Sequence, residues 1–205
     1  MNTDQLANHV IEKSDGFDRF LVAIAGPPGA GKSTLSDQLL NGLRERNIAS
    51  KVVPMDGFHL DNTVLNQRSL LDRKGAPETF DAAGFVDLVK RLSEAGGDIN
   101  FPKFDRQKDT SIANADTVYA NDRILIFEGN YLLLKDPIWT DLQKYWNATL
   151  LLNPGIDTLE RRLVQRWLDH GLNKDAARQR ALHNDIPNAH YVLENSIPAE
   201  IQIDT

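Results

Sequence analysis

The stretch from Gly26 to Thr34, GPPGAGKST, matches the pattern G-x-x-x-x-G-K-[ST] in full. The glycines Gly26, Gly29 and Gly31 allow the backbone to fold so that successive N–H groups point inward and form a nest for anions. Lys32 adds a positive charge for the β- and γ-phosphates, and the Ser33 hydroxyl is the expected Mg²⁺ ligand. The other loop positions are Pro27, Pro28, Ala30 and Thr34. The motif predicts a site for a nucleoside triphosphate, most often ATP.

A carboxylate follows a second apolar run. Residues 123–129, RILIFEG, are typical of a buried strand that ends near Glu128, and residues 20–26, FLVAIAG, are typical of another directly before the phosphate motif. Parallel sheets build their sites at the carboxyl ends of strands, so Glu128 is expected beside the phosphate loop. There it would hold Mg²⁺ directly or through water. The alternative is a solvated residue at a strand end.

Residues 52–62, VVPMDGFHLDN, begin like a strand and then present polar groups just past its end. One interpretation is a strand followed by an ordinary Asp-Gly turn. The other is that Asp56 faces a reacting hydroxyl as a general base, or lies in the second shell of the magnesium ion. Gly57 would let the chain turn away and leave Asp56 at the strand exit. His59 is either a substrate contact or a packed structural residue.

The surrounding elements follow from hydrophobic periodicity. A helix is expected over 32–47, after the phosphate motif, and the polar stretch 100–122 is expected to be a long functional loop. Further strands are expected at 50–56, 148–153 and 199–204, the last at a sheet edge, and further helices at 81–97, 155–171 and 174–184. Short strands interleaved with helices predict an α/β fold, a mainly parallel sheet with helices on both faces. No linker divides the chain, so residues 1–205 are expected to form a single domain.

The composition narrows the functional classes. The 205 residues carry a formal net charge of −6, which disfavours a nucleic-acid-binding surface. The chain has no cysteine, which excludes disulfides, thiolate metal sites and cysteine nucleophiles. The N-terminus has no cationic and apolar segments of a secretory signal, and no apolar run approaches the roughly 18–20 residues of a membrane span. We expect a cytoplasmic protein with no nucleic-acid partner and no membrane insertion; its oligomeric state is not indicated.

Five motifs together give a family resemblance: GPPGAGKST, MDGFHLDN, RKGAPETFD, FPKFDR and IFEGNYLLL. From about residue 18 to residue 196 the chain resembles the P-loop kinases that include uridine kinase, phosphoribulokinase and bacterial-type pantothenate kinase. It most resembles bacterial members described as fructose-transport-system kinases. The resemblance implies the P-loop NTPase fold with a small helical lid at about 155–185, and it implies ATP and Mg²⁺ as cofactors.

The resemblance also implies roles for particular residues. Asp56 matches the family's base, or the group that orients the acceptor hydroxyl. Glu78, in RKGAPETFD, matches a carboxylate that binds substrate hydroxyls. Arg162 and Arg166 match the lid arginines that clamp phosphates, whereas Arg161 aligns less well, and a plain polar helix face is the alternative. The segment NDIPNAHY would flank the adenine, which makes Asn188 a candidate.

The departures from the family concern the phosphate acceptor. Uridine kinases carry a Tyr and a His near residues 102–109 that read the pyrimidine, whereas this chain has Phe104 and, by spacing, Asp109. Additional substrate-binding elements of the longer pantothenate kinases are not found. The remaining pocket lining suits a small polyhydroxylated substrate such as a sugar or sugar acid, and comprises Asp56, Arg73, Lys74, Glu78, Asp105 and Arg106.

Several alternatives stay open at this point. Arg73 and Lys74 could be solvated loop residues, and Asp105 and Arg106 could serve only the turn. A pantothenate or nucleoside kinase is the nearest alternative function. A P-loop regulatory NTPase without a small-molecule acceptor is an alternative of a different class. The acidic motif MDGFH followed by RKGAPETFD favours a kinase, because a kinase needs an acceptor pocket.

Overall fold

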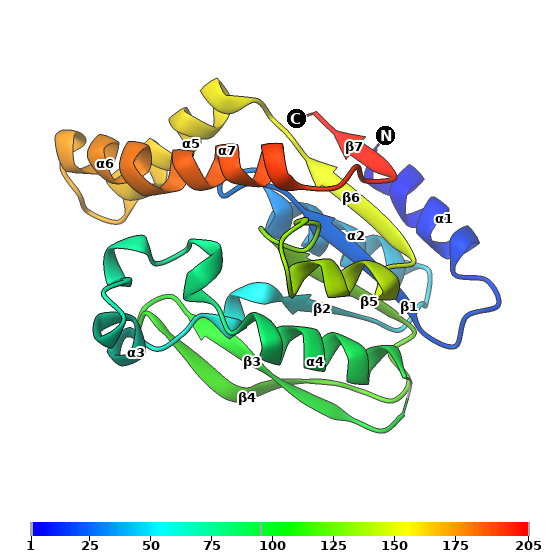
Figure 1. The fold of residues 1–205 in the computed structure, drawn as a ribbon. Helices are drawn as coiled ribbons and strands as arrows, with labels where there is room; N and C mark the ends of the chain where they lie inside the picture. The colour runs from blue at the N-terminus through cyan, green and yellow to red at the C-terminus, as the bar shows by residue number, and fades with distance from the viewer. Residues whose placement is uncertain (1, 95, 205) are drawn as a thin grey trace.

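The computed structural model describes residues 2–94 and 96–204, so positions 1, 95 and 205 of the expected domain lie outside the described residues. Its centre is a parallel sheet of five strands in the order β2-β5-β1-β6-β7 (Figure 1). The strands are β1 (Phe20–Ala25), β2 (Ser50–Pro54), β5 (Ile124–Gly129), β6 (Ala148–Leu152) and β7 (Ile201–Ile203). The predicted parallel sheet is confirmed, with β7 at one edge.

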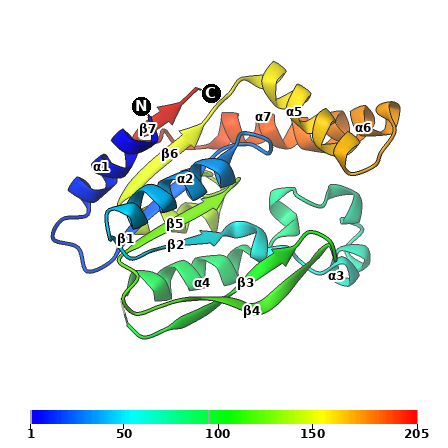
Figure 2. The same cartoon turned by 180° about the vertical axis from the view of Figure 1, so that it is seen from behind.

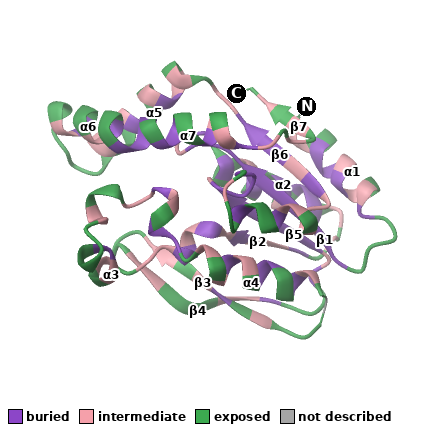
Figure 3. Ribbon diagram, in the orientation of Figure 1, coloured by how far each residue is buried: buried purple, intermediate pink, exposed green. Residues whose placement is uncertain are grey.

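The sheet is covered on both faces because its central strands are apolar on both sides. In β1, Leu21, Ala23 and Ala25 belong to one hydrophobic cluster, whereas the alternating Phe20, Val22 and Ile24 belong to the other. All six residues of β1 and of β5 are buried. In Figure 3 the buried residues accordingly concentrate along the sheet and the inner sides of the helices. This explains the continuous apolar runs in the sequence.

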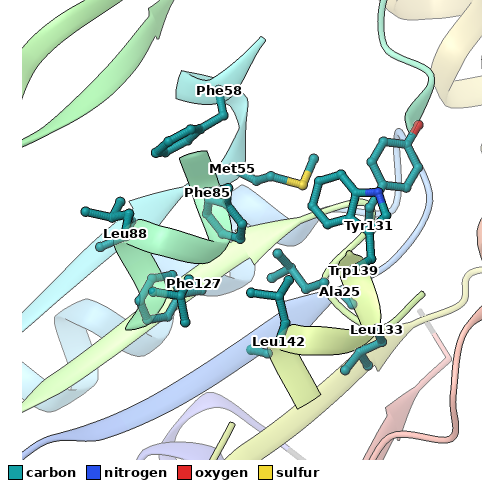
Figure 4. Packing of buried hydrophobic residues seen from close by; sticks show 14 of the residues in the cluster. Ala25, Met55, Phe58, Phe85, Leu88, Phe127, Tyr131, Leu133, Trp139 and Leu142 are labelled. Carbon is teal, nitrogen blue, oxygen red and sulfur yellow. The ribbon is translucent and has the colours of Figure 1, made fainter. Parts of the chain in front are cut away.

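Helices from distant parts of the chain supply the two covering layers. On one face lie α1 (Thr3–Lys13), α2 (Lys32–Glu45) and α5 (Ile156–Asp169), and on the other lie α4 (Ala82–Ser93) and the short helix η4 (Trp139–Tyr145). Figure 4 shows the hydrophobic cluster under α4 and η4, where Phe85 and Leu88 of α4 pack with Phe127, Tyr131 and Trp139. The aromatic Trp139 is therefore a core residue.

The remaining helices are α3 (Asn62–Gln67), α6 (Lys174–Arg180) and α7 (Ile186–Asn195). Helix α6 runs through a π-turn, Ala181–Asp185, directly into α7, and with α5 it extends past the sheet (Figures 1 and 2). This extension coincides with the lid expected at about 155–185. Helix α4 ends at Ser93, earlier than the expected 97, and residue 95 of that expectation lies outside the described residues.

Two features of the chain differ from the expectations. Residues 100–122 are not a loop, because β3 (Ile99–Asp105) and β4 (Thr110–Val118) pair as an antiparallel hairpin. The hairpin was missed because only one residue of β4 is buried and the strand lacks a period-two apolar pattern. Helix α1 was also not anticipated, although Asn2 and Gln5 form a capping box at its start. Among the described residues, no helix is long and apolar enough to span a membrane.

Gly57 has a further role besides the expected turn. A Cβ added at this residue would lie 2.1 Å from the carbonyl oxygen of Pro102 in β3. The glycine is therefore required for the close approach of the hairpin to the short helix η1 (Met55–Phe58). This contact places the hairpin over the end of β2, where Asp56 lies.

The Gly57→Ala variant is expected to lose about 3 kcal/mol of unfolding free energy, because the clash is with backbone that cannot rotate away. Urea denaturation measures the loss. Gly97→Ala is the matched control, since an added Cβ there meets nothing within 4 Å, and it should change stability by only a few tenths of a kcal/mol. Equal stability of the two variants would contradict the packing role of Gly57.

Candidate active site

The phosphate loop joins the end of β1 to the start of α2, as the sequence predicted. Gly26, Gly29 and Gly31 all have positive φ angles, of 152°, 78° and 97°. At Gly26 an added Cβ would lie 2.8 Å from the Leu152 carbonyl oxygen, so the loop can leave the sheet here only through glycine. The loop thus ends at the N-terminus of a fourteen-residue helix, whose unpaired N–H groups favour anions.

Lys32 is held under this loop. Its side chain is buried, and its Nζ donates to the Pro27 carbonyl at 3.0 Å and to the Asn130 Oδ1 at 2.7 Å. Burial lowers the pKa of Lys32, against the pull of the negative charges of Glu128 and Asp56. Asn130 follows β5 and was not anticipated, because an amide after a strand has no distinctive spacing. The ammonium group is therefore fixed before any phosphate arrives.

Glu128 lies at the carboxyl end of β5, next to the start of α2. The Ser33 hydroxyl donates to its Oε2 at 3.3 Å, so the two expected Mg²⁺ ligands are neighbours. Burial, and then the negative charge of Asp56, raise the pKa of Glu128 above its usual range. A cation would relieve this electrostatic cost, and a hydroxyl with a carboxylate is the hard-oxygen set that Mg²⁺ takes along with nucleotide phosphates and water. The residues fit the ion.

Asp56 lies in η1, immediately after β2. Its side chain is partly exposed and lines a cavity that also reaches the phosphate loop. The guanidinium of Arg106, from the hairpin, approaches its Oδ2 to 3.5 Å. The Nδ1 of His59 lies 2.8 Å from the Asp56 carbonyl oxygen, and burial lowers the pKa of His59. The imidazole packs between the rings of Phe80 and Phe104, with centroids at 4.1 and 4.6 Å. His59 is thus both a packed residue and part of the cavity wall.

A single cavity of about 700 Å³ joins the phosphate loop, the ends of β2 and β5, the hairpin and the lid. The expected site residues that line it are Pro28, Gly29, Gly31, Lys32, Ser33, Thr34, Asp56, His59, Lys74, Arg106, Glu128, Arg166 and Asn188. Lining residues that were not proposed as site residues include Asn62, Phe80, Phe104, Asp109, Asn130, Trp167, Arg180 and Asp185. These come from segments that only the folded chain brings together.

Some expected site residues lie elsewhere. Arg73 and Glu78 pair with each other at 3.4 Å and line a second cavity of about 630 Å³, which shares Phe80 and Asn188 as wall residues with the first. The Asp105 carboxylate accepts from the backbone N–H groups of residues 107 and 108 in the hairpin turn. These three side chains are therefore separated from the phosphate loop.

The two aligned lid arginines differ in position. Arg162 donates to the carbonyl oxygens of Gly29 and Ala30, at 3.4 and 3.3 Å, and so contacts the phosphate loop itself. Arg166 lines the main cavity. The less certain Arg161 points to Thr158 on its own helix, at 3.4 Å.

Lys74 has a largely buried side chain, 11% exposed, that lines the cavity away from the phosphate loop. Its Nζ donates to Asn62 Oδ1 at 2.7 Å and lies 2.9 Å from Asp109 Oδ1. The ammonium group also lies over the Phe104 ring, 5.0 Å from the centroid. The cavity wall away from the phosphate loop thus alternates polar groups and aromatic faces.

The lid contributes a cluster centred on an indole. Trp167 donates from its Nε1 to Asp185 Oδ2 at 2.6 Å. The guanidinium carbons of Arg166 and Arg180 lie 5.7 and 5.3 Å from the indole ring. Burial raises the pKa of Asp185, although the Trp167 hydrogen bond and both arginines act in the opposite direction. The indole thereby fixes where two cavity-lining arginines lie.

The phosphate loop between a buried strand and a helix, on a parallel sheet covered on both faces, defines the P-loop NTPase fold. A sequence profile described as "Phosphoribulokinase / Uridine kinase family" matches residues 21–176. The chain belongs to this family, as its motifs indicated.

Three similar proteins extend this result. The chain is 47% identical to a "putative fructose transport system kinase" of Silicibacter sp. TM1040, whose structure superimposes with a TM-score of 0.94 over 98% of both chains. It is 34% identical over 207 residues to "Putative uridine kinase C227.14" of Schizosaccharomyces pombe, covering 97% of this chain and 88% of that protein. It is 31% identical over 154 residues to a "Pantothenate kinase" of Lacticaseibacillus casei, covering 72% of this chain and 49% of that protein.

The chain is therefore an ATP-dependent P-loop kinase of the uridine kinase and pantothenate kinase type, a phosphotransferase that acts on a hydroxyl group. Membership in this family favours the kinase over a regulatory NTPase.

The raised pKa of Asp185 predicts a pH-dependent stability. Because the folded-state pKa lies above the ordinary value of 3.8, wild-type stability falls as the pH rises from that value through the folded pKa. Asp185→Asn retains an acceptor for the Trp167 N–H without the buried charge. We expect the variant to gain stability over wild type between pH 4 and pH 8, measured by calorimetry. Asp175→Asn, on the exposed side of α6, is the control and should show no such gain. If Asp185→Asn also gains no stability, the raised pKa of Asp185 is contradicted.

Proposed function

We propose that the protein is a cytoplasmic kinase that transfers the γ-phosphate of ATP to a hydroxyl of a small polar metabolite, a fructose-like sugar or a sugar acid. The observation that carries the proposal is the shared cavity, which Lys32 and Glu128 line on the nucleotide side and Asp56 lines on the other. A phosphoryl-transfer site needs such an in-line arrangement of donor, metal and acceptor more than it needs covalent chemistry.

The mechanism assigns one task to each group. Bound Mg²⁺, on Ser33 and Glu128, would neutralise charge on the β- and γ-phosphates. Lys32 and Arg166 contact the transferring group, and Arg162 braces the loop that holds it. The acceptor oxygen attacks the γ-phosphorus, ADP departs, and the acceptor proton passes to Asp56. Arg106, paired with the Asp56 carboxylate, orients that carboxylate toward the cavity.

The acceptor class is supported by the far wall of the cavity. The polar side chains Asn62, Lys74 and Asp109 can bind hydroxyl groups, and the rings of Phe80 and Phe104 can cover the apolar face of a small ring. By the resemblance of the motifs, Phe104 and Asp109 replace the Tyr and His with which uridine kinases read the pyrimidine, which disfavours a nucleoside. The similarity to the "putative fructose transport system kinase" also supports a sugar as the acceptor.

Asn188 and Glu78 keep their proposed roles only in part. Asn188 is buried at the wall that the two cavities share, a position from which it can contact a bound ligand at either side. Glu78 would reach an acceptor only if that molecule extended into the second cavity.

An acceptor screen tests the function. ATP turnover is measured with sugars, sugar acids, nucleosides and pantothenate, next to thermal shifts with a non-hydrolysable ATP analogue. We expect a sugar or sugar acid to raise turnover and the midpoint temperature together. Stimulation by pantothenate or a nucleoside alone would contradict the acceptor class, and turnover unaffected by every acceptor would contradict the acceptor-phosphorylating function.

Asp56→Asn is expected to lower kcat by about 10²–10⁴-fold, because the variant cannot accept the hydroxyl proton. The affinity for ATP, measured by calorimetric titration, should stay nearly unchanged. Asp61→Asn is the matched control: Asp61 is the N-cap of α3, five residues along the same segment, and asparagine caps equally well. Near-normal kcat in Asp56→Asn would show that Asp56 is not the base.

Glu128→Gln tests the metal site. Removing the carboxylate charge should raise the Mg²⁺ concentration for half-maximal turnover by about tenfold or more, because a neutral amide is a weaker ligand for a hard cation. A Mg²⁺ titration at saturating ATP measures this shift. Glu45→Gln, at the far end of α2, should leave the titration unchanged, and an unchanged midpoint in Glu128→Gln would remove Glu128 from the metal site.

A further inference from the structure

Two buried polar side chains lie in the π-turn of residues 181–185, between α6 and α7. Asn184 and Asp185 are 3% and 8% exposed. Single π-turns inside helices occur frequently at functional sites, because the extra residue turns side chains out of the regular helical register. Here the turn directs both side chains toward the rest of the molecule, where each meets a different part of the active site.

The first of these meets the acceptor loop, which we define as residues 71–75. Asn184 Nδ2 donates to the Lys74 carbonyl oxygen at 3.0 Å. From α6, Arg180 donates to the Asp72 carbonyl oxygen, also at 3.0 Å. Both bonds go to backbone atoms, so they depend on the conformation of the acceptor loop and not on its side chains. The lid is thus joined to the acceptor loop at two points.

The acceptor loop also reaches the cavity. Lys74 accepts from Asn184 with its backbone oxygen, while its Nζ lines the acceptor side of the cavity. One residue later, the Gly75 carbonyl accepts from the hydroxyl of Tyr131. Figure 4 shows the Tyr131 ring packed beside Trp139 in the core. Because Gly75 is anchored to Tyr131, a movement of Lys74 on binding an acceptor would displace the Lys74 carbonyl oxygen.

The second side chain of the turn meets the lid arginines. Asp185 accepts from Trp167, and the Trp167 indole lies against the guanidinium of Arg166, which lines the cavity. Arg180 stacks on the same indole while it binds the acceptor loop. A continuous series of contacts thus runs from the Lys74 carbonyl through Asn184, Asp185 and Trp167 to Arg166.

We propose that Asn184 is a positioning residue that couples the acceptor loop to the lid arginine Arg166. The proposal rests on the proposed function, in which Arg166 meets the γ-phosphate. Occupation of the acceptor side then favours the lid arrangement that phosphoryl transfer needs. The Asn184 Oδ1 atom is buried and has no hydrogen-bond partner among the described residues, so the side chain is joined to its surroundings by hydrogen bonding only through its N–H donor.

Coupling between two sites is reciprocal, so it can be measured from the nucleotide side without knowing the acceptor. Hydrogen exchange is followed with and without Mg²⁺ and a non-hydrolysable ATP analogue. The reporter is the segment 70–79, where the amides of residues 73, 74 and 76 donate hydrogen bonds to carbonyl oxygens of the same segment. These bonds break when the acceptor loop opens. The segment 26–36 reports nucleotide binding directly. The nucleotide-induced change in each protein is compared, so a general loss of stability cancels.

In the wild type we expect the nucleotide to slow exchange in both segments. In Asn184→Ala the slowing of 70–79 should fall by about three- to tenfold, the range that one net hydrogen bond supports, while that of 26–36 is kept. Arg180→Gln, at an exposed hydrogen bond, provides a second variant that is expected to fold normally and to lose part of the same effect. Gln165→Ala, on the exposed side of α5, is the control and should resemble the wild type.

Equal slowing of 70–79 in Asn184→Ala and the wild type would overturn the coupling. So would a wild type in which 26–36 is protected and 70–79 is not. If neither segment responds in the wild type, nucleotide binding itself fails, which contradicts the proposed function and, with it, the coupling. The two failures are therefore distinguishable.

Discussion

A lysine and a glutamate that are buried in the same site, where β5 ends and α2 begins, are the constraint on which the site depends. β1 and β5 are hydrogen-bonded neighbours, so the helix that follows β1 and the carboxylate that ends β5 must meet. The meeting is electrostatically costly, because burial lowers the pKa of Lys32 and raises that of Glu128. Each charge partly offsets the burial of the other. Under the proposed function, a nucleotide with its metal ion would complete the compensation. In the protein without ligand, the buried charges of Lys32 and Glu128 therefore favour the binding of a charged ligand at this site.

The proposed acceptor side of the cavity has a different physical basis. It is assembled by close packing of a hairpin onto η1, which Gly57 permits because no Cβ lies between it and Pro102. The hairpin carries Phe104, Arg106 and Asp109 to the cavity, opposite the nucleotide. The phosphate side therefore rests on sheet register, whereas the acceptor side rests on one packed contact and its loops.

What the sequence revealed follows the same division. The phosphate loop, the central strands and Glu128 are encoded in local patterns, a nine-residue motif and continuous apolar runs, and they lie where expected. The hairpin was mistaken for a loop because its exposed strand carries no apolar alternation. Asn130 and the Trp167–Asp185 pair join segments that are distant in sequence, so no local pattern could indicate them. Arg73 and Glu78 were expected beside Lys74 in the pocket, but the turns at 71–73 and 77–79 direct them to a second cavity.

The central claim is that the acceptor hydroxyl lies between the γ-phosphate and Asp56. The most direct measurement is a crystal structure with MgADP, a fluoride mimic of the transferring phosphoryl group and the acceptor identified by turnover. We expect one acceptor oxygen in line with the mimic and about 2.6–3.2 Å from an Asp56 carboxylate oxygen, with the metal ion on Ser33 and Glu128. An acceptor bound in the second cavity beside Glu78, with its hydroxyl groups away from Asp56, would contradict it.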